Sequence, residues 1–263
     1  CIPTPASEPL DAFLDLARDA RDVVVLTGAG MSVESGIPTF RDAQTGLWER
    51  HDPEELATID AWERDPDFVW AWYRWRAKLI RDVQPNVGHR ALADWADAER
   101  ANLWIVTQNI DDLHERAGSS VLAHLHGSIF ALRCSECDTP FDEADDAALA
   151  LPSDPVERLA PPRCPVCGAA VRPGVVWFGE ELPQEPFAHA EAALERADLV
   201  LSVGTSGVVQ PAAGLSYRAL TRGVPVVEIN PAETELSDDA TLVWRAPAAA
   251  ALPALVSALW GKA

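Results

Sequence analysis

The sequence predicts an α/β fold whose large domain is a doubly wound parallel sheet. Apolar runs rich in Val, Ile and Leu are typical of strands buried on both faces, and four of them occur at residues 23–27, 103–107, 199–203 and 224–229. Segments with helical patterns precede or separate these runs at residues 9–19, 86–98 and 184–196. Such alternation of strand and helix predicts parallel strands joined by helices that cover the sheet.

Two stretches break this alternation and predict a smaller second domain. Residues 37–81 form a Trp-rich helical module, and residues 133–172 carry four of the five cysteines. The large domain is then expected to combine residues 1–36, 82–132 and 173–263. Residues 138–163, rich in Asp, Ala and Pro, predict a loop with at most a short helix.

Composition and charge restrict the classes of function. The 263 residues are 48% hydrophobic, which is enough to bury a core. Lys and Arg total 21 against 41 Asp and Glu, and the net charge of −20 repels a phosphate backbone. No run reaches the roughly 18 to 20 apolar residues that span a bilayer, and no signal segment is evident. We therefore expect a soluble, cytoplasmic protein that binds neither nucleic acid nor membrane directly.

Small or polar residues follow each predicted strand, where a doubly wound sheet binds its ligands. They are Gly28-Ala29-Gly30, residues 108–111, Gly204-Thr205-Ser206 and Asn230. A glycine turn of the first kind favours a phosphate site, because backbone N–H groups can approach a pyrophosphate there. Val33 departs from the dehydrogenase fingerprint, however, and a tight turn without a ligand is an alternative.

Four cysteines form two C-x-x-C pairs, Cys134 with Cys137 and Cys164 with Cys167. Four thiolates in two tight turns suit tetrahedral Zn²⁺, and in a reducing cytosol this spacing favours metal over disulfides. Because sulfur fills every position, no site is open to water and the zinc is expected to be structural. The interval of residues 138–163 exceeds the usual spacing of about 15 to 20 residues, so a long loop should lie within the zinc module.

The glycine turn continues into a longer motif, and further motifs follow it in order. Residues 28–41 read GAGMSVESGIPTFR; then come TQNID at 107–111, LHGS at 125–128, the cysteine pairs, VWFGE at 176–180, GTS at 204–206 and IN at 229–230. Together they resemble the sirtuins, the NAD-dependent protein deacylases, over about residues 20–255. The resemblance implies a Rossmann-type large domain that binds NAD, and a small domain made of a zinc ribbon and a helical module.

The resemblance also implies which residues hold NAD. The glycine turn and Ser32 would bind the pyrophosphate, whereas Thr205, Ser206 and Asn230 would bind the adenosine half. The other implied positions are Ile37, Phe40, Arg41 and Asp42 in a loop over the nicotinamide ribose, Gln108, Asn109, Ile110 and Asp111 after the second strand, and Gly204 and Ala248. Precise positioning of the ribose supplies much of a group-transfer rate, so Asn109 and Asp111 count as catalytic.

His126 is the candidate general base, because imidazole titrates near working pH and can accept a ribose hydroxyl proton. His124 competes for this role and is expected on the same strand face, but only His126 is followed by Gly-Ser as in the family. For any single histidine a purely structural role is the alternative.

Ala57 and the segment WAWYRWR at residues 70–76 are similar to bacterial and mitochondrial sirtuins that prefer acidic acyl groups. Tyr73 and Arg76 share one face of a helix, where a hydroxyl and a planar guanidinium can bind a carboxylate. Ala57 would keep the cavity roomy. The alternative is an amphipathic helix whose aromatic residues lie in the core and whose arginine is solvated.

Two further segments resemble the edges that hold an acyl-lysine peptide as an added strand. They contribute Val176, Phe178, Gly179 and Glu180, and Val208. Main-chain pairing tolerates many sequences, so target proteins cannot be named.

The implied reaction removes succinyl, malonyl or acetyl groups from protein lysines and yields nicotinamide and 2′-O-acyl-ADP-ribose. ADP-ribosyl transfer, a non-enzymatic zinc-ribbon binding module and a dehydrogenase are the alternatives. The oligomeric state is left open, with a monomer as one option.

Overall fold

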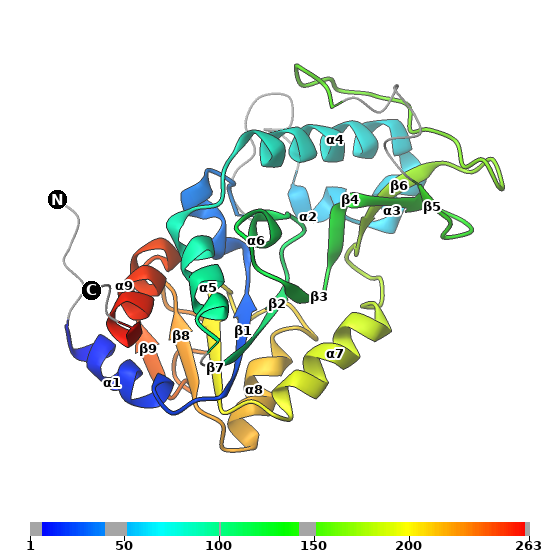
Figure 1. Ribbon diagram of the computed structural model, residues 1–263. Helices are drawn as coiled ribbons and strands as arrows, with labels where there is room; N and C mark the ends of the chain where they lie inside the picture. Colours follow the sequence, from blue (N-terminus) through cyan, green and yellow to red (C-terminus); the bar gives the residue numbers. More distant parts are fainter. Residues whose placement is uncertain (1–6, 40–51, 100, 142–150, 261–263) are drawn as a thin grey trace. The chain divides into compact units, whose positions relative to one another are not determined.

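The computed structural model describes residues 7–39, 52–99, 101–141 and 151–260 (Figure 1). The chain divides into two compact units, residues 1–36, 84–125 and 183–263 in the first and residues 37–83 and 126–182 in the second. These limits differ from the expected ones, since residues 82–83, 126–132 and 173–182 fall in the second unit. The reason is that β4 (Gly127–Cys134) and β6 (Val171–Val175) pair with each other in a separate sheet.

The first unit contains a six-stranded sheet in the order β3-β2-β1-β7-β8-β9, with every neighbouring pair parallel. Its strands are β1 (Asp22–Thr27), β2 (Asn102–Thr107), β3 (Val121–His124), β7 (Leu199–Val203), β8 (Val226–Ile229) and β9 (Leu242–Trp244). The predicted doubly wound sheet is confirmed. The two edge strands, β3 and β9, are short and were not predicted. The order reverses between β1 and β7, which is where such sheets bind ligands.

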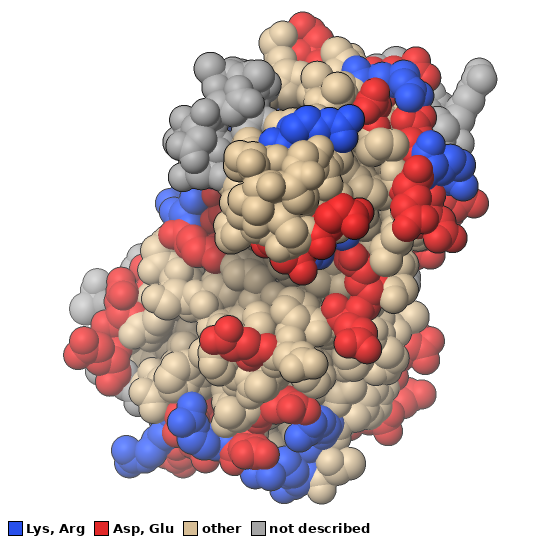
Figure 2. All heavy atoms as spheres, turned by 90° about the vertical axis from the view of Figure 1, so that its right-hand side faces the viewer, with Lys and Arg blue, Asp and Glu red and all other residues tan. Residues whose placement is uncertain are grey.

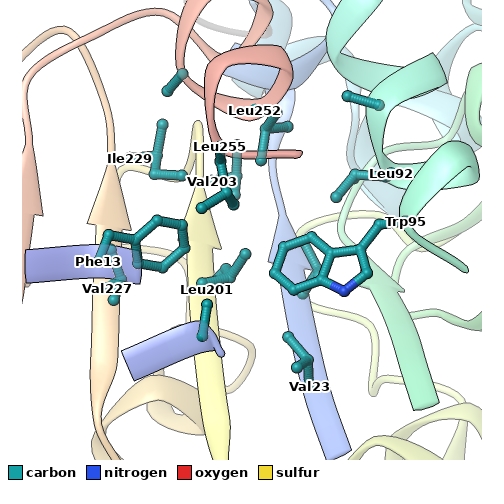
Figure 3. Close-up of a cluster of buried hydrophobic side chains, with 14 of the residues drawn as sticks. Phe13, Val23, Leu92, Trp95, Leu201, Val203, Val227, Ile229, Leu252 and Leu255 are labelled. Atoms are coloured by element: carbon teal, nitrogen blue, oxygen red, sulfur yellow. The ribbon is translucent and has the colours of Figure 1, made fainter. Parts of the chain in front are cut away.

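Helices cover both faces of this sheet. They are α1 (Ser7–Ala17), α5 (Val87–Asp97), α6 (Leu113–Arg116), α7 (Gln184–Leu194), α8 (Gly214–Thr221) and α9 (Ala248–Trp260). One core cluster joins α1, α5 and α9 to the sheet through residues such as Phe13, Trp95 and Leu252 (Figure 3). A second cluster packs α7 and α8 against the alternate side chains of β1, Val24 and Leu26. Successive residues of a strand point to opposite faces, so the apolar run of β1 serves both layers.

The second unit combines three helices with a small sheet. The helices are α2 (Pro53–Leu56), α3 (Ile59–Arg64) and α4 (Pro66–Asp82), and the sheet has the antiparallel order β5-β4-β6 with β5 at Pro140–Phe141. Each helix begins at a polar N-cap, since Asp52, Thr58 and Asp65 accept hydrogen bonds from the first-turn N–H groups of α2, α3 and α4. Such caps are worth about 1 kcal/mol each, which helps short helices to form.

Acidic side chains are spread over the face shown in Figure 2, in line with the net charge of −20. Within the described residues, no helix is long and apolar enough to cross a membrane.

Candidate functional site

The turn after β1 lies directly against the turn after β7. A Cβ on Gly28 would come within 2.8 Å of the Gly204 oxygen, and one on Gly30 within 2.7 Å of the Gly204 Cα. Gly204 itself has a φ of +63°, and a Cβ there would meet the Met31 nitrogen at 2.5 Å. The glycines of both turns are therefore required by the close approach of two backbones at the carboxyl edge of the sheet.

We expect Gly204→Ala to reduce the free energy of unfolding by about 2 kcal/mol or more, because it adds a backbone clash to the cost of a positive φ. Gly223→Ala is a matched control: Gly223 has a φ of +77°, but nothing lies within 4 Å of its added Cβ. Urea unfolding of both variants separates the clash from the strain. If both variants lost the same free energy of unfolding, the contact between the two turns would add nothing to the strain of a positive φ.

The expectation that several N–H groups of the glycine turn face an anion needs correction. The N–H groups of Gly28 and Gly30 donate to the oxygens of Val203 and Gly204 at 3.0 and 2.9 Å. Those of Met31 and Ser32 donate within the turn, which forms the short 3₁₀ helix η1 (Ala29–Met31). Among residues 28–32, the N–H of Ala29 is the one for which the described part of the chain supplies no acceptor.

Side chains from the ends of β1 and β2 converge beside this turn. The Ser32 hydroxyl donates to Asp111 Oδ2 at 2.9 Å, and Asn109 Nδ2 donates to Ser32 Oγ at 3.2 Å. All three residues are buried. Burial raises the pKa of Asp111, and the hydrogen bonds from the Leu113 N–H and the Ser32 hydroxyl only partly offset it. Three of the residues expected to hold the cofactor thus form one polar cluster.

A second group of polar residues, Thr27, Thr107 and His114, contacts this cluster and was not predicted from the sequence. Thr27 Oγ1 donates to Thr107 Oγ1 at 2.8 Å, and Thr107 Oγ1 accepts the Asn109 N–H at 3.0 Å. His114 Nε2 lies 3.1 Å from the Thr27 hydroxyl, and its ring contacts that of His89 at 4.9 Å. The signal available in the sequence was the threonine at the end of each of two apolar strands, Thr27 in β1 and Thr107 in β2.

Burial keeps the side chains of His89 and His114 neutral. It lowers the pKa of His89 to about 4, with the Arg90 charge acting in the same direction. It also lowers the pKa of His114 well below its ordinary value, and the neighbouring histidines add to the effect. Neither imidazole therefore carries a positive charge at neutral pH.

His124 and His126 do not share a strand face, contrary to expectation. β3 ends at His124, whereas His126 is half-buried in the turn before β4. His124 Nε2 lies 2.6 Å from Glu115 Oε1, and its Nδ1 lies 3.3 Å from the Asn109 oxygen. Burial alone would lower the pKa of His124, but the Glu115 carboxylate outweighs it and the pKa is raised. His124 is thus already occupied by an ion pair.

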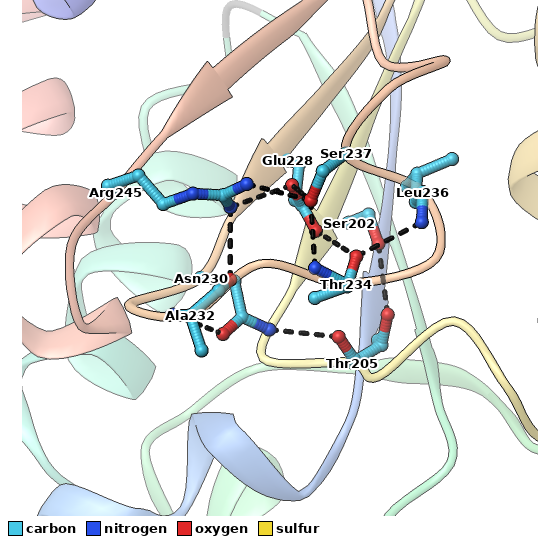
Figure 4. A network of polar contacts seen from close by, with 9 residues as sticks. All are labelled: Ser202, Thr205, Glu228, Asn230, Ala232, Thr234, Leu236, Ser237 and Arg245. Carbon is cyan, nitrogen blue, oxygen red and sulfur yellow. Dashed lines mark hydrogen bonds and ion pairs between the residues drawn. The ribbon is translucent and has the colours of Figure 1, made fainter.

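The turns after β7 and β8 are joined by a side chain. Asn230 Nδ2 donates to the Thr205 oxygen at 2.9 Å, and the Thr205 hydroxyl lies 3.1 Å from that of Ser202 (Figure 4). Ser206 is exposed beside them. Gln108 and Thr205 line one small pocket together with Gly207 and Tyr217.

The other predicted cofactor positions differ in their exposure to solvent. Ala248 is buried as the first residue of α9, Ile110 and Ile37 are half-buried, and Phe40, Arg41 and Asp42 lie outside the described residues.

In the second unit, α4 and the segment after β6 bring the predicted acyl-binding residues together. Trp177 Nε1 donates to the Tyr73 hydroxyl oxygen at 3.0 Å, and the Phe178 N–H donates to the Ala57 oxygen at 2.9 Å. Burial raises the pKa of Tyr73, with the nearby Arg76 charge opposing it. The Arg76 guanidinium lies over the ring of Trp72, 5.1 Å from its centroid. Tyr73 therefore contacts the segment that contains Trp177, and Arg76, one helical turn further along α4, is close enough for its charge to act on the Tyr73 hydroxyl.

Glu180 has a different environment from the one expected of a substrate contact. Arg172 donates to both of its carboxylate oxygens at 2.6 and 2.9 Å, and the Trp177 N–H donates to it at 2.7 Å. Burial would raise the pKa of Glu180, but these bonds and the Arg172 charge outweigh it, so the pKa is lowered. Glu180 therefore stabilises the conformation of the segment around Trp177. Phe178 and Val208, by contrast, have exposed side chains, at 43% and 47%.

The four predicted zinc ligands lie at one place. Their sulfur atoms are all within 4.8 Å of one another, with Cys134 to Cys167 at 3.4 Å and Cys137 to Cys164 at 3.7 Å. Zn–S bonds of about 2.3 Å in a tetrahedron place sulfur atoms about 3.8 Å apart. The donor set and its spacing fit a structural zinc ion.

Comparisons with known proteins agree with these features. The model of the Sir2 family matches residues 28–211. "NAD-dependent protein deacylase 2" of Corynebacterium efficiens is 55% identical over 93% of this chain and 95% of its own length. "NAD-dependent protein deacylase" of Mycobacterium tuberculosis is 51% identical over 90% of this chain and 97% of its own length.

Solved structures are also similar to the chain over nearly its whole length. The complex of a Sir2 homologue with NAD has a TM-score of 0.86 at 43% identity, and covers 95% of this chain and 93% of the other. The structure of Sir2Tm bound to a propionylated peptide has a TM-score of 0.81 at 31% identity, and covers 97% and 99%. With the family's motifs, its fold and a cysteine cluster that fits zinc all present, the chain belongs to the Sir2 family, the sirtuins.

Proposed function

We propose that this sirtuin is an NAD-dependent protein lysine deacylase that accepts succinyl and malonyl groups as well as acetyl groups. The observation that carries the proposal is the buried cluster of Ser32, Asn109 and Asp111 at the carboxyl edge of the sheet. Relatives that are more than half identical and match over nearly their full length are named NAD-dependent protein deacylases. The complex of a similar protein with a propionylated peptide supports an acyl-lysine peptide as substrate.

The residues at the strand ends fit NAD by their chemistry. The N–H of Ala29 would hold the pyrophosphate, and Thr205, Ser206 and Asn230 would hold the adenosine half. Gln108, Asn109 and Asp111 would orient the nicotinamide ribose and its carboxamide, since amides and carboxylates pair with hydroxyl and amide groups. When bound, NAD supplies an electrophilic ribose carbon and a nicotinamide leaving group.

His126 would accept the proton of a ribose hydroxyl at its imidazole nitrogen. Its neighbour His124 is unsuited to this role, because the Glu115 carboxylate already holds one ring nitrogen at 2.6 Å. Asn109 and Asp111 would act by holding the ribose in one orientation, which converts binding energy into rate. The expected products are free lysine, nicotinamide and 2′-O-acyl-ADP-ribose.

Tyr73 and Arg76 would bind the terminal carboxylate of a succinyl or malonyl group. Trp177 fixes the Tyr73 oxygen as an acceptor at 3.0 Å, so the hydroxyl hydrogen is left to donate. An arginine adds two parallel, charge-assisted hydrogen bonds to a carboxylate but gains nothing from an acetyl methyl group. Glu180 is best assigned to supporting this segment through Arg172, and no longer to the substrate itself.

We expect Arg76→Met to remove roughly 2 to 4 kcal/mol of transition-state stabilisation for succinyl-lysine peptides and much less for acetyl-lysine peptides. Arg64→Met is a matched control, because Arg64 is an exposed arginine on the adjacent helix α3. The measurement is kcat/KM on paired succinyl and acetyl peptides of one sequence. An unchanged ratio of the two values in Arg76→Met would mean that Arg76 does not bind the acyl carboxylate.

Mass spectrometry of the products tests the reaction itself. An acyl-lysine peptide incubated with the protein and NAD should give the deacylated peptide and 2′-O-acyl-ADP-ribose in equal amounts. ADP-ribose that stays attached to protein, with the acyl group untouched, would instead identify an ADP-ribosyltransferase.

A further inference from the structure

Glu228, at the end of β8, is a buried carboxylate surrounded by donors. It is 1% exposed, yet it accepts hydrogen bonds from Thr234 Oγ1, from Ser237 Oγ at 2.8 Å and from Arg245 Nη1 at 2.9 Å (Figure 4). A charge removed from water is tolerated only when it is paired and fully hydrogen-bonded. The three partners, all of which follow Glu228 in sequence, meet that condition.

These partners also bond to the backbone of the segment that links β8 to β9. Ser237 Oγ accepts the Thr234 N–H at 2.8 Å, and Thr234 Oγ1 accepts the Leu236 N–H at 3.1 Å. Arg245 Nη1 donates to the Ala232 oxygen at 3.0 Å, and its Nη2 donates to Ser237 Oγ at 2.7 Å. The linking segment is therefore folded around one carboxylate.

Asn230 begins this linking segment, two residues after Glu228. Its side-chain oxygen accepts the Ala232 N–H at 3.1 Å, while its Nδ2 donates to the Thr205 oxygen at 2.9 Å. The Ala232 oxygen is in turn held by Arg245. A continuous set of hydrogen bonds thus runs from Glu228 through Arg245 and Ala232 to Asn230 and the turn after β7.

We propose that Glu228 is a positioning residue for binding the adenosine half of the dinucleotide. It keeps Asn230 and the Thr205 turn in their binding orientation before the ligand arrives. The inference rests on the proposed function, which assigns Thr205, Ser206 and Asn230 to that half. A site ordered in advance pays less conformational entropy on binding, so loss of Glu228 should weaken affinity and leave the chemical step unchanged.

Glu228→Gln tests this proposal. Its side-chain NH₂ cannot accept the hydrogen bonds that Ser237 or Arg245 donates to the Glu228 carboxylate, so the contacts of the linking segment are broken. We expect the Kd for ADP-ribose, measured by calorimetry, and the KM for NAD to rise about tenfold or more, with kcat within about twofold. Arg245→Met should behave in the same way, whereas Arg245→Lys, which keeps the charge, should recover most of the affinity. Ser237→Ala is the milder variant if Glu228→Gln does not fold.

Asp198→Asn is the control for a purely structural role. Asp198 is a carboxylate of the same sheet that accepts the N–H groups of Arg21 and Asp22 at 2.9 and 3.1 Å, at the amino ends of the strands. It should alter thermal stability without changing the Kd for ADP-ribose.

If the folded Glu228→Gln, or Ser237→Ala and Arg245→Met, bound ADP-ribose with unchanged affinity, the role of Glu228 would be overturned and the proposed function would not be affected. A fall in kcat at unchanged KM for NAD would overturn that role as well. If the wild-type chain binds ADP-ribose but removes no acyl group, the proposed reaction is wrong. The role of Glu228 is then decided by comparing the Kd for ADP-ribose of the variants with that of the wild type. If the wild type does not bind ADP-ribose, both are overturned.

Discussion

His126→Ala should retain NAD binding and lose deacylase turnover by at least about 10² to 10⁴-fold, because the loss of a general base alone costs that much. The expectation rests on the Leu-His-Gly-Ser motif and on the position of His126 in a half-buried turn. The measurement is turnover with saturating NAD and acyl-lysine peptide, together with the Kd for NAD. A mutant with near-normal turnover would exclude His126 from the reaction.

His189→Ala is the better control for this experiment. His189 is exposed on α7, so its replacement should leave turnover unchanged. His124 is less suitable, since its ring pairs with Glu115 and lies 3.3 Å from the Asn109 oxygen. Its removal would disturb a residue next to the polar cluster and confuse a structural effect with a catalytic one.

Removal of zinc should destabilise the protein. Cys164→Ser breaks a four-thiolate set whose sulfur atoms lie within 4.8 Å of one another, and metal binding is coupled to local folding. We expect the melting temperature to fall by roughly 10 °C and activity to fall with it. Elemental analysis should find about one equivalent of zinc in the wild type and much less in the variant.

Cys1→Ser, which changes a cysteine outside the two C-x-x-C pairs, should keep both zinc and stability. Chelation of the wild type should reproduce the effect of Cys164→Ser. A zinc-free preparation with an unchanged melting curve and full activity would show that the cluster does not need metal.

Local signals in the chain were sufficient for the central strands, for three of the covering helices and for the metal ligands. Val23 to Thr27 is apolar enough to be buried on both faces, and β1 is found there. Asn86 was an expected helix start, and it caps α5 by accepting the Gly88 N–H at 2.8 Å. Each of these features depends on residues within one or two turns of chain, so a sequence pattern is enough to predict it.

Partners far apart in the chain could be found only in the folded molecule. The bond between Trp177 and Tyr73 joins positions 104 residues apart. The turn at residues 28–30 was predicted to offer backbone N–H groups to a phosphate, yet those of Gly28 and Gly30 donate to Val203 and Gly204. Glu180 and Glu228 are two acidic residues among 41 in the sequence, and only their packing against Arg172 and Arg245 sets them apart. Residue type limits what a side chain can bond to, but burial and distance decide which bond forms, and both arise when strands distant in sequence pack together.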